Sequence, residues 1–264
     1  MDFSFADLEI DGRSQRLEYA WVRSERNDAP LIVFLHEGLG SLAMWKDYPQ
    51  TLCAAAGARG LVFSRYGYGR STPRPAAEKW PVEFMHAQAR DVLPALFAWL
   101  GIEDPPWLFG HSDGGSIAML YAAAFPQRVA GLVVVAAHVF VEDVSVASIE
   151  QARLAYAATD LRQKLARYHD DPDSAFGGWN DIWLDPAFRA WTIEDCLPRI
   201  RCPVLAVQGE DDEYGTMAQI DAIARCVPHA RLLKLSACGH SPHRDQPAAL
   251  TNAVVAFLNE HRVG

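Results

Sequence analysis

The sequence contains few cysteines, and their spacing shows no pairing pattern. The 264 residues include five, namely Cys53, Cys196, Cys202, Cys226 and Cys238. Their spacing is typical of neither a disulfide framework nor a zinc site. The start of the chain also lacks the basic residues and apolar core of a secretory signal. We therefore expect free thiols and a cytoplasmic protein.

Long apolar runs and clusters of basic residues are absent as well. The longest mostly apolar stretch covers residues 130–141, whereas a helix needs about 20 residues to span a bilayer. The net charge is −9, with no local excess of Lys and Arg. We therefore expect neither nucleic acid nor a membrane as a partner. We expect a small-molecule substrate, no cofactor and no metal; a homo-oligomer is possible.

What the sequence does contain is an alternation of short apolar runs and helix-like segments. An N-terminal hairpin, residues 3–10 and 16–22, is expected around an Asp11-Gly12 turn. Apolar runs follow, as in strands buried on both faces; they lie at residues 30–35, 61–63, 107–110, 131–136 and 204–208. A further strand is expected at residues 231–235. Helix-like segments between them, among them 43–56, 80–100 and 247–262, predict a mostly parallel sheet. Ligands bind beyond the carboxyl ends of such strands.

This alternation stops between residues 139 and 198, where apolar residues recur at helical spacing and no strand is evident. We therefore predict a core domain of residues 1–138 and 199–264, with 139–198 inserted as a helical lid. Aromatic residues of the lid are candidates for the substrate pocket, although such residues also pack a lid onto a core. These candidates are Phe140, Tyr156, Trp179, Trp183 and Trp191.

The stretch that organises the chain is Gly110-His111-Ser112-Asp113-Gly114, between an apolar run and a helix-like run. Strand, sharp turn and helix form the expected context of a nucleophile elbow, in which a strained serine stands clear of the sheet. Side chains two residues before and after the serine would collide, which explains Gly110 and Gly114. We therefore predict that Ser112 is a catalytic nucleophile.

A serine nucleophile needs a base, and the base needs an acid that orients it. Asp212 and His240 each follow a predicted strand and complete the order Ser, Asp, His. Alternatives for the acid are Asp211 beside Asp212, and Glu142 or Asp143 after the sixth strand. His243 competes with His240 as the base, but a place at the pocket rim or helix start suits it better.

These motifs resemble those of the α/β-hydrolase superfamily over nearly the whole chain. The matching pieces are His36-Glu37-Gly38-Leu39-Gly40, Ser64 to Ser71, Gly110 to Gly114, Gly209 to Asp212 and Gly239-His240. The resemblance implies an eight-stranded sheet, a lid after the sixth strand and a Ser112, Asp212, His240 triad. It also implies an oxyanion hole formed by the backbone N–H groups of Gly38 and Asp113.

Two positions depart from the superfamily pattern. Glu37 replaces a glycine and is expected to point to solvent, although it could also place an acid near the substrate. Ser64 stands where an aspartate is usual and Arg65 follows it, so the bonding of that loop should differ. His36 and His111 are expected to be buried structural histidines; with Glu37 and His243 they complete the candidate pocket residues.

The sequence thus favours a cofactor-free serine hydrolase that cleaves a carboxylic ester or lactone of a small to medium apolar acyl substrate. A thioesterase, or a carbon–carbon bond hydrolase acting on products of aromatic ring cleavage, is the alternative. A metal site built from Cys238, His240, His243 and Asp245 lacks a second cluster at zinc-type spacing. A non-catalytic binding module would have no need of Ser112 and His240 together.

Overall fold

The computed structural model describes residues 2–24 and 29–261. It contains one sheet with the strand order β1-β2-β4-β3-β5-β6-β7-β8. The strands are β1 (Phe3–Ile10), β2 (Arg13–Val22), β3 (Leu31–Leu35), β4 (Arg59–Phe63), β5 (Trp107–His111), β6 (Gly131–Val135), β7 (Val204–Gly209) and β8 (Arg231–Leu235). The β1–β2 and β2–β4 pairs are antiparallel and all the others are parallel. The predicted eight-stranded, mostly parallel sheet is confirmed.

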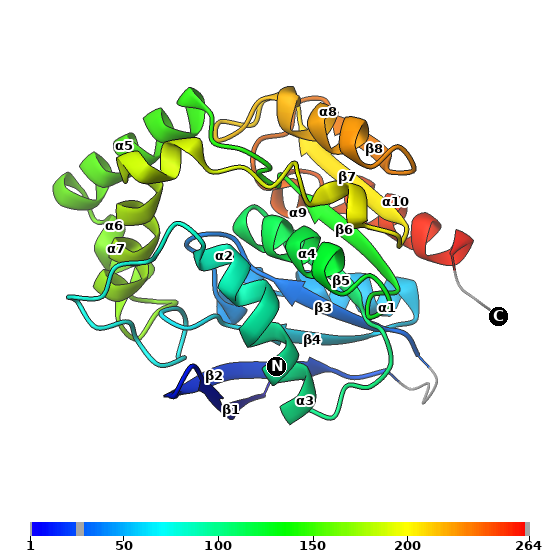
Figure 1. Cartoon of the computed structure of the whole chain (residues 1–264), viewed down its shortest axis with the longest axis horizontal. Helices are drawn as coiled ribbons and strands as arrows, with labels where there is room; N and C mark the ends of the chain where they lie inside the picture. The colour runs from blue at the N-terminus through cyan, green and yellow to red at the C-terminus, as the bar shows by residue number, and fades with distance from the viewer. Residues whose placement is uncertain (1, 25–28, 262–264) are drawn as a thin grey trace.

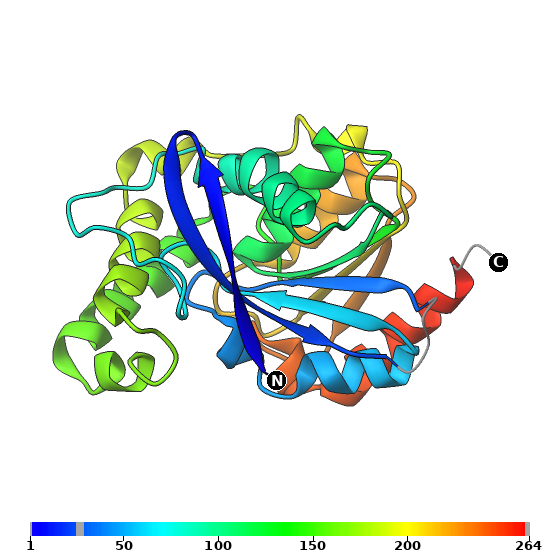
Figure 2. The same cartoon turned by 90° about the horizontal axis from the view of Figure 1, so that it is seen from below.

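Helices cover both faces of this sheet, which is why its central strands β3, β5 and β6 are buried along their whole length (Figures 1 and 2). On one face lie α1 (Tyr48–Ala56) and α10 (Pro247–Glu260). On the other lie α2 (Phe84–Ala87), α3 (Leu93–Trp99), α4 (Asp113–Ala124) and α8 (Met217–Cys226). The closing helix was expected to reach Arg262, which lies outside the described residues.

Two predicted helices are interrupted by prolines. The segment expected at 43–56 consists of a 3₁₀ turn, η1 (Leu42–Trp45), and of α1, whose second residue is Pro49. The segment expected at 80–100 begins only at Phe84 and contains a π-helical turn, η2 (Gln88–Val92), before α3. Because Pro94 has no N–H to donate, it fits only the first turn of a new helical segment.

Residues 139–198, which we call the insertion, lie between β6 and β7 in the chain, and their helices α5, α6 and α7 lie at the left of Figure 1. They form α5 (Asp143–Ala158), α6 (Leu161–Leu165), α7 (Pro172–Trp183), η3 (Pro186–Ala190) and η4 (Leu197–Arg199). The structure describes this whole range, and its only extended pairing is a bridge between Phe140 and Thr192. The expected helical character of the region therefore agrees with the structure.

Candidate active site

The turn between β5 and α4 holds Ser112 in a strained backbone conformation. Its φ of 53° and ψ of −121° lie in a region that residues with a side chain rarely adopt. A Cβ atom on Gly114 would lie 2.1 Å from the carbonyl oxygen of Leu35, and one on Gly110 would lie 2.3 Å from that of Gly114. The two flanking glycines are therefore required by close backbone approach, as the motif predicted.

The structure brings His240, in the loop after β8, against Asp212, in the loop after β7. The Nδ1 atom of His240 lies 2.8 Å from Oδ1 of Asp212, whose side chain is almost fully buried. Burial raises the pKa of Asp212, but the hydrogen bond and charge of His240 and the backbone N–H of Tyr214 together outweigh burial, so the pKa is lowered overall. Because a carboxylate only accepts, His240 carries its proton on Nδ1 and leaves Nε2 free as a base.

The alternative acids for this role lie elsewhere. Asp211 is exposed, and the side chain of Asp143 is 92% exposed and pairs with Arg189. The Glu142 carboxylate accepts bonds from the N–H and hydroxyl of Thr216. Among these acids, only Asp212 bonds to His240 within the described part of the chain.

Ser112 and His240 line the same cavity, which has a volume of about 100 Å³. Its other lining residues are Glu37, Gly38, Leu39, His138, Ile149, Trp179, Trp183 and Tyr214. They come from the loops that follow β3, β5, β6, β7 and β8, and from α5 and α7. The carboxyl ends of the parallel strands thus meet the insertion at this cavity, as expected for such a sheet.

The two residues predicted to donate backbone N–H groups to an oxyanion are Asp113 and Gly38. Asp113 is the first residue of α4, so its N–H has no partner within the helix and lies at the positive end of the helix dipole. Gly38 lines the cavity, and Trp179 packs so closely on it that an added Cβ would lie 2.2 Å from the indole. Trp183 donates from Nε1 to the Asp113 carboxylate, 3.2 Å away.

Comparison with known proteins agrees with this architecture. The model of a family described as the alpha/beta hydrolase family matches residues 32–253. The chain belongs to the alpha/beta hydrolase family. It is 26% identical over 259 residues to the putative carbamate hydrolase RutD of Pseudomonas savastanoi, a match covering 90% of this chain and 96% of that protein. It is 28% identical over 189 residues to the human serine hydrolase BPHL, covering 67% of this chain and 61% of that protein.

Solved structures show the same fold. The enol-lactonase from Burkholderia xenovorans LB400 superposes with a TM-score of 0.75 at 23% identity, covering 97% of this chain and 100% of that chain. A thermophilic esterase from Thermogutta terrifontis superposes with a TM-score of 0.73 at 20% identity, covering 98% of this chain and 100% of that chain.

Within this family fold, several predicted pocket residues lie outside the cavity that contains Ser112. His36 and His111 are buried and bonded to backbone, as expected of structural histidines. Trp191 stacks on Phe188, and Tyr156 stacks on another aromatic residue of the insertion. Phe140 and His243 are also absent from the lining. Of the predicted pocket residues, only Glu37, Trp179 and Trp183 line the cavity.

Four lining residues were not predicted: Leu39, His138, Ile149 and Tyr214. His138 was detectable, because it interrupts the apolar run of the sixth strand just where strand ends carry site residues. Its ring centroid lies 6.0 Å from that of His240. Burial lowers the pKa of His138 to about 3, so it stays neutral and adds no charge beside the base.

The expectation that Glu37 points to solvent is wrong. Its side chain is only 15% exposed, with Oε2 at 3.4 Å from Nδ1 of His111 and Oε1 at 3.5 Å from Nη2 of Arg244. Burial would raise the pKa of Glu37, but bonding to His111 and the nearby cations hold it well below its usual range. A carboxylate buried beside cations costs less than one buried alone, which explains why Glu37 need not face water.

The missing aspartate at Ser64 is replaced by a carboxylate from another element. The Ser64 hydroxyl donates to Oε2 of Glu18 at 2.7 Å, and the N–H of Arg70 donates to the same oxygen. Glu18 is buried in β2, whose register beside β4 places it next to this loop. The altered bonding that the sequence predicted therefore consists of a carboxylate supplied from β2.

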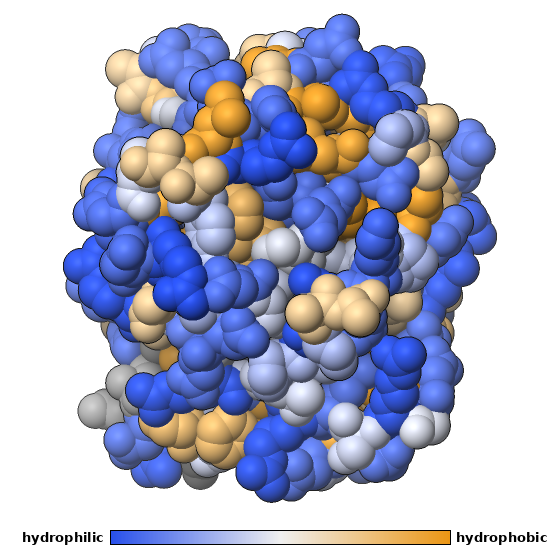
Figure 3. Space-filling model, turned by 90° about the vertical axis from the view of Figure 1, so that its left-hand side faces the viewer, coloured by the Kyte–Doolittle hydropathy of each residue, from blue (hydrophilic) through white to orange (hydrophobic). Residues whose placement is uncertain are grey.

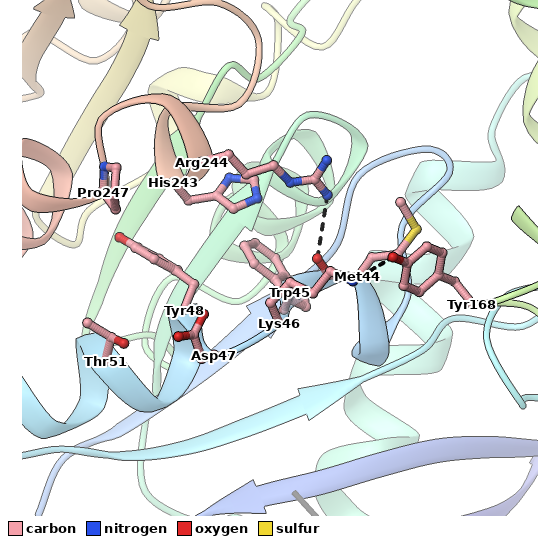
Figure 4. Close-up of a pocket in the computed structure, with 10 residues that line it drawn as sticks. All are labelled: Met44, Trp45, Lys46, Asp47, Tyr48, Thr51, Tyr168, His243, Arg244 and Pro247. Carbon is pink, nitrogen blue, oxygen red and sulfur yellow. Dashed lines mark hydrogen bonds between the residues drawn. The ribbon is translucent and has the colours of Figure 1, made fainter. Parts of the chain in front are cut away.

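A larger cavity, of about 570 Å³, lies beside the site and is drawn in Figure 4. It is lined by residues 44–48 and Thr51, from η1 to α1, by Tyr168 of the insertion, and by His243, Arg244 and Pro247. Arg244 lies between the two cavities, since its Nη2 atom is 3.5 Å from Glu37 and 3.4 Å from the carbonyl oxygen of Met44. Neither Ser112 nor His240 lines this cavity, so it stands apart from the groups that would carry the chemistry.

The residues of the rival metal site, which the sequence disfavoured, have other partners. The N–H of Gly239 donates to Asp245, and His243 packs against Trp45 and Tyr48. Across residues 2–24 and 29–261 no group of three or more His, Cys, Asp or Glu side chains is arranged to hold a metal ion. In the same ranges no helix combines the length and apolarity needed to cross a membrane.

Proposed function

We propose that the chain is a serine hydrolase that cleaves a carboxylic ester or lactone through an acyl-enzyme. The observation that carries this proposal is the bond between His240 and Asp212, with His240 and the strained Ser112 on one cavity wall. A neutral imidazole held by a carboxylate, next to a serine on an elbow, is the arrangement that activates a hydroxyl.

The proposed reaction proceeds in two halves. The Ser112 hydroxyl attacks the acyl carbon while Nε2 of His240 takes its proton, and the amides of Gly38 and Asp113 stabilise the oxyanion. The proton then passes from His240 to the leaving alkoxide as the bond between carbon and oxygen breaks. In the second half Nε2 of His240 takes a proton from a water molecule, which attacks the acyl carbon. The bond from the acyl carbon to the Ser112 oxygen then breaks, His240 returns the proton to that oxygen, and the acid is released. Asp212 stays ionised and orients His240 throughout.

The walls of the cavity support a small to medium apolar acyl group. Its volume is about 100 Å³, and Leu39, Ile149, Trp179 and Trp183 supply apolar surface. Because Ile149 and both tryptophans belong to the insertion, we propose that residues 139–198 act as a lid over the core formed by the rest of the chain. The side of the molecule on which α5, α6 and α7 lie has a mostly hydrophilic surface with separate apolar patches, as suits a lid that faces water (Figure 3).

The test is hydrolysis of p-nitrophenyl butyrate together with labelling by a fluorophosphonate, read by intact mass. We expect wild type to turn over and to take up one label. Ser112→Ala should take up none and lose at least about 10⁴-fold in kcat. Turnover of lactone, thioester and vinylogous diketone substrates, measured in parallel, distinguishes an esterase or lactonase from a thioesterase or a carbon–carbon bond hydrolase. Absence of both labelling and turnover in the folded wild type would contradict the proposal and favour a binding module.

A further inference from the structure

Arg65 is a buried cation that the catalytic steps above do not use. It lies in the loop after β4 and is only 2% exposed, with its guanidinium 4.7 Å from the centre of the Tyr68 ring. Placing a charge this deep is costly unless it is paired and bonded. The contacts of the Arg65 guanidinium therefore indicate its role in the structure.

Arg65 contacts both segments that carry the proposed oxyanion donors, the N–H groups of Gly38 and Asp113. Its Nη2 atom donates to the carbonyl oxygen of Glu37 at 2.9 Å and lies 3.6 Å from the carboxylate of Asp113. The carbonyl of Glu37 belongs to the same peptide unit as the N–H of Gly38. Asp113 carries the other proposed oxyanion donor on its own backbone. One guanidinium thus contacts the two segments whose N–H groups must converge.

The same carbonyl oxygen accepts from two further donors. The N–H of Gly40 lies 3.0 Å away and Nδ1 of His36 lies 2.7 Å away. The backbone N–H of Arg65 donates to Nε2 of His36 at 3.0 Å, so the proton of a neutral His36 must be on Nδ1. Burial holds the pKa of His36 well below its usual range, which keeps the ring neutral, and its two hydrogen bonds select this tautomer.

We propose that Arg65, together with His36, is a positioning residue for the oxyanion hole. A trans peptide is planar, so fixing the direction of the Glu37 carbonyl fixes the Gly38 N–H on the opposite side of the same plane. Donors on a carbonyl also polarise the peptide and strengthen its N–H as a donor. The inference rests on the proposed serine hydrolase function and adds to it the group that orients one oxyanion donor.

The experiment compares Arg65→Lys with Arg74→Lys, a matched control in a second buried arginine whose guanidinium donates to backbone carbonyls of Pro75 and Glu78 away from the site. A lysine at position 65 keeps the charge beside Asp113 but cannot reproduce the planar guanidinium. Fluorophosphonate labelling counts active sites, and kcat and KM for p-nitrophenyl butyrate are then expressed per labelled site. The inhibition constant of a trifluoromethyl ketone, which mimics the tetrahedral oxyanion, is the second measurement.

We expect Arg65→Lys to lose about 10- to 100-fold in kcat per labelled site, below the full loss of an oxyanion donor. KM should stay within about threefold, and the ketone should lose affinity by the same factor as kcat/KM, because both read the transition state. Arg74→Lys should stay within about threefold of wild type in all of these measurements. A role in folding alone would lower the number of labelled sites without changing kcat per site.

A second variant guards against misfolding at position 65. Arg65→Met combined with Asp113→Asn removes the buried cation and its partner charge together, so no unpaired charge is left. If this folded double variant keeps wild-type kcat and ketone affinity, or if Arg65→Lys matches Arg74→Lys, the positioning role is overturned. If wild type itself is folded but unlabelled, the proposed function fails instead, so the two failures are distinguishable.

Discussion

The cavity has two walls that are built in different ways. The core wall consists of loops after the strands, where Ser112, Asp212 and His240 are fixed by backbone strain, close glycine packing and buried hydrogen bonds. The insertion wall consists of side chains from α5 and α7, namely Ile149, Trp179 and Trp183. Under the proposed function, the core wall would set the positions of the reacting atoms, whereas the insertion wall would set the space left for the substrate.

The largest expected effect is on kcat, and it distinguishes Asp212 of the core from Asp143 of the insertion. Asp212→Asn should lower kcat by about 10⁴-fold, because asparagine at this place favours the wrong tautomer of His240, the proposed base. Asp143→Asn, at the start of the insertion helix α5, should stay within about twofold because that carboxylate is exposed and pairs with Arg189 rather than His240. Steady-state kinetics on p-nitrophenyl butyrate checks both.

The outcome that contradicts this contrast is specific. If Asp143→Asn lost activity while Asp212→Asn retained it, the acid would come from the loop after β6, and the bond between Asp212 and His240 would be structural only. A thermal melt of each variant ensures that loss of activity is not loss of fold.

A second, smaller effect compares two buried tryptophans of the insertion. Trp179 packs on Gly38 and lines the cavity, whereas Trp191 stacks on Phe188 away from it. Trp179→Ala should raise KM for the butyrate ester about tenfold and admit longer acyl chains, because it removes apolar wall. Trp191→Ala should instead cost about 3–5 kcal/mol of unfolding free energy and leave the acyl preference unchanged.

An acyl-chain series from acetate to octanoate, with denaturant unfolding alongside, measures both variants. Equal acyl preferences in Trp179→Ala and wild type would show that the insertion wall does not set substrate size. The same conclusion follows if Trp191→Ala shifts the preference as much as Trp179→Ala does.

The sequence predicted features that depend on neighbouring residues, but not contacts between residues far apart in the chain. Patterns that follow from local rules were readable: continuous apolar runs marked the buried strands, and glycines around Ser112 marked a close backbone approach. The contacts of Glu37 were not readable, because its partners His111 and Arg244 lie far along the chain and come together with it only in the fold. Glu18 likewise replaces the missing aspartate from a strand that only the sheet register places beside Ser64.

Side-chain direction was the other limit. Helical spacing predicted that the aromatic residues of the insertion face the interior of the protein. A residue that faces the interior can either line the cavity or pack against other side chains. Trp179 and Trp183 face the cavity, while Tyr156 and Trp191 stack on other aromatic residues. Spacing along one helix cannot separate these two environments, because the separation depends on how the helix is docked.

The smallest expected effect concerns that docking, which depends in part on His169 of the insertion. Its Nδ1 atom accepts from the N–H of Gly69 at 3.0 Å, and Nε2 lies 3.1 Å from the carbonyl oxygen of Leu39, to which it donates. Burial lowers the pKa of His169, despite the nearby carboxylates of Glu37 and Asp170. The neutral ring therefore joins the insertion to two loops of the core.

Protonation of His169 would remove the acceptor that Gly69 uses, so the sign of the pH effect follows. The unfolded chain takes up this proton below about pH 6.5 and the folded chain only at lower pH, so stability is complete above 6.5 and falls as the pH drops. His169→Gln keeps one acceptor and one donor but does not titrate. At pH 8 we expect its free energy of unfolding to lie within about 1 kcal/mol of the wild-type value. Between pH 6.5 and 5 we expect it to lose less stability than wild type. The other buried histidines are common to both proteins and cancel in this difference, so parallel pH curves would mean that His169 does not couple docking of the insertion to pH.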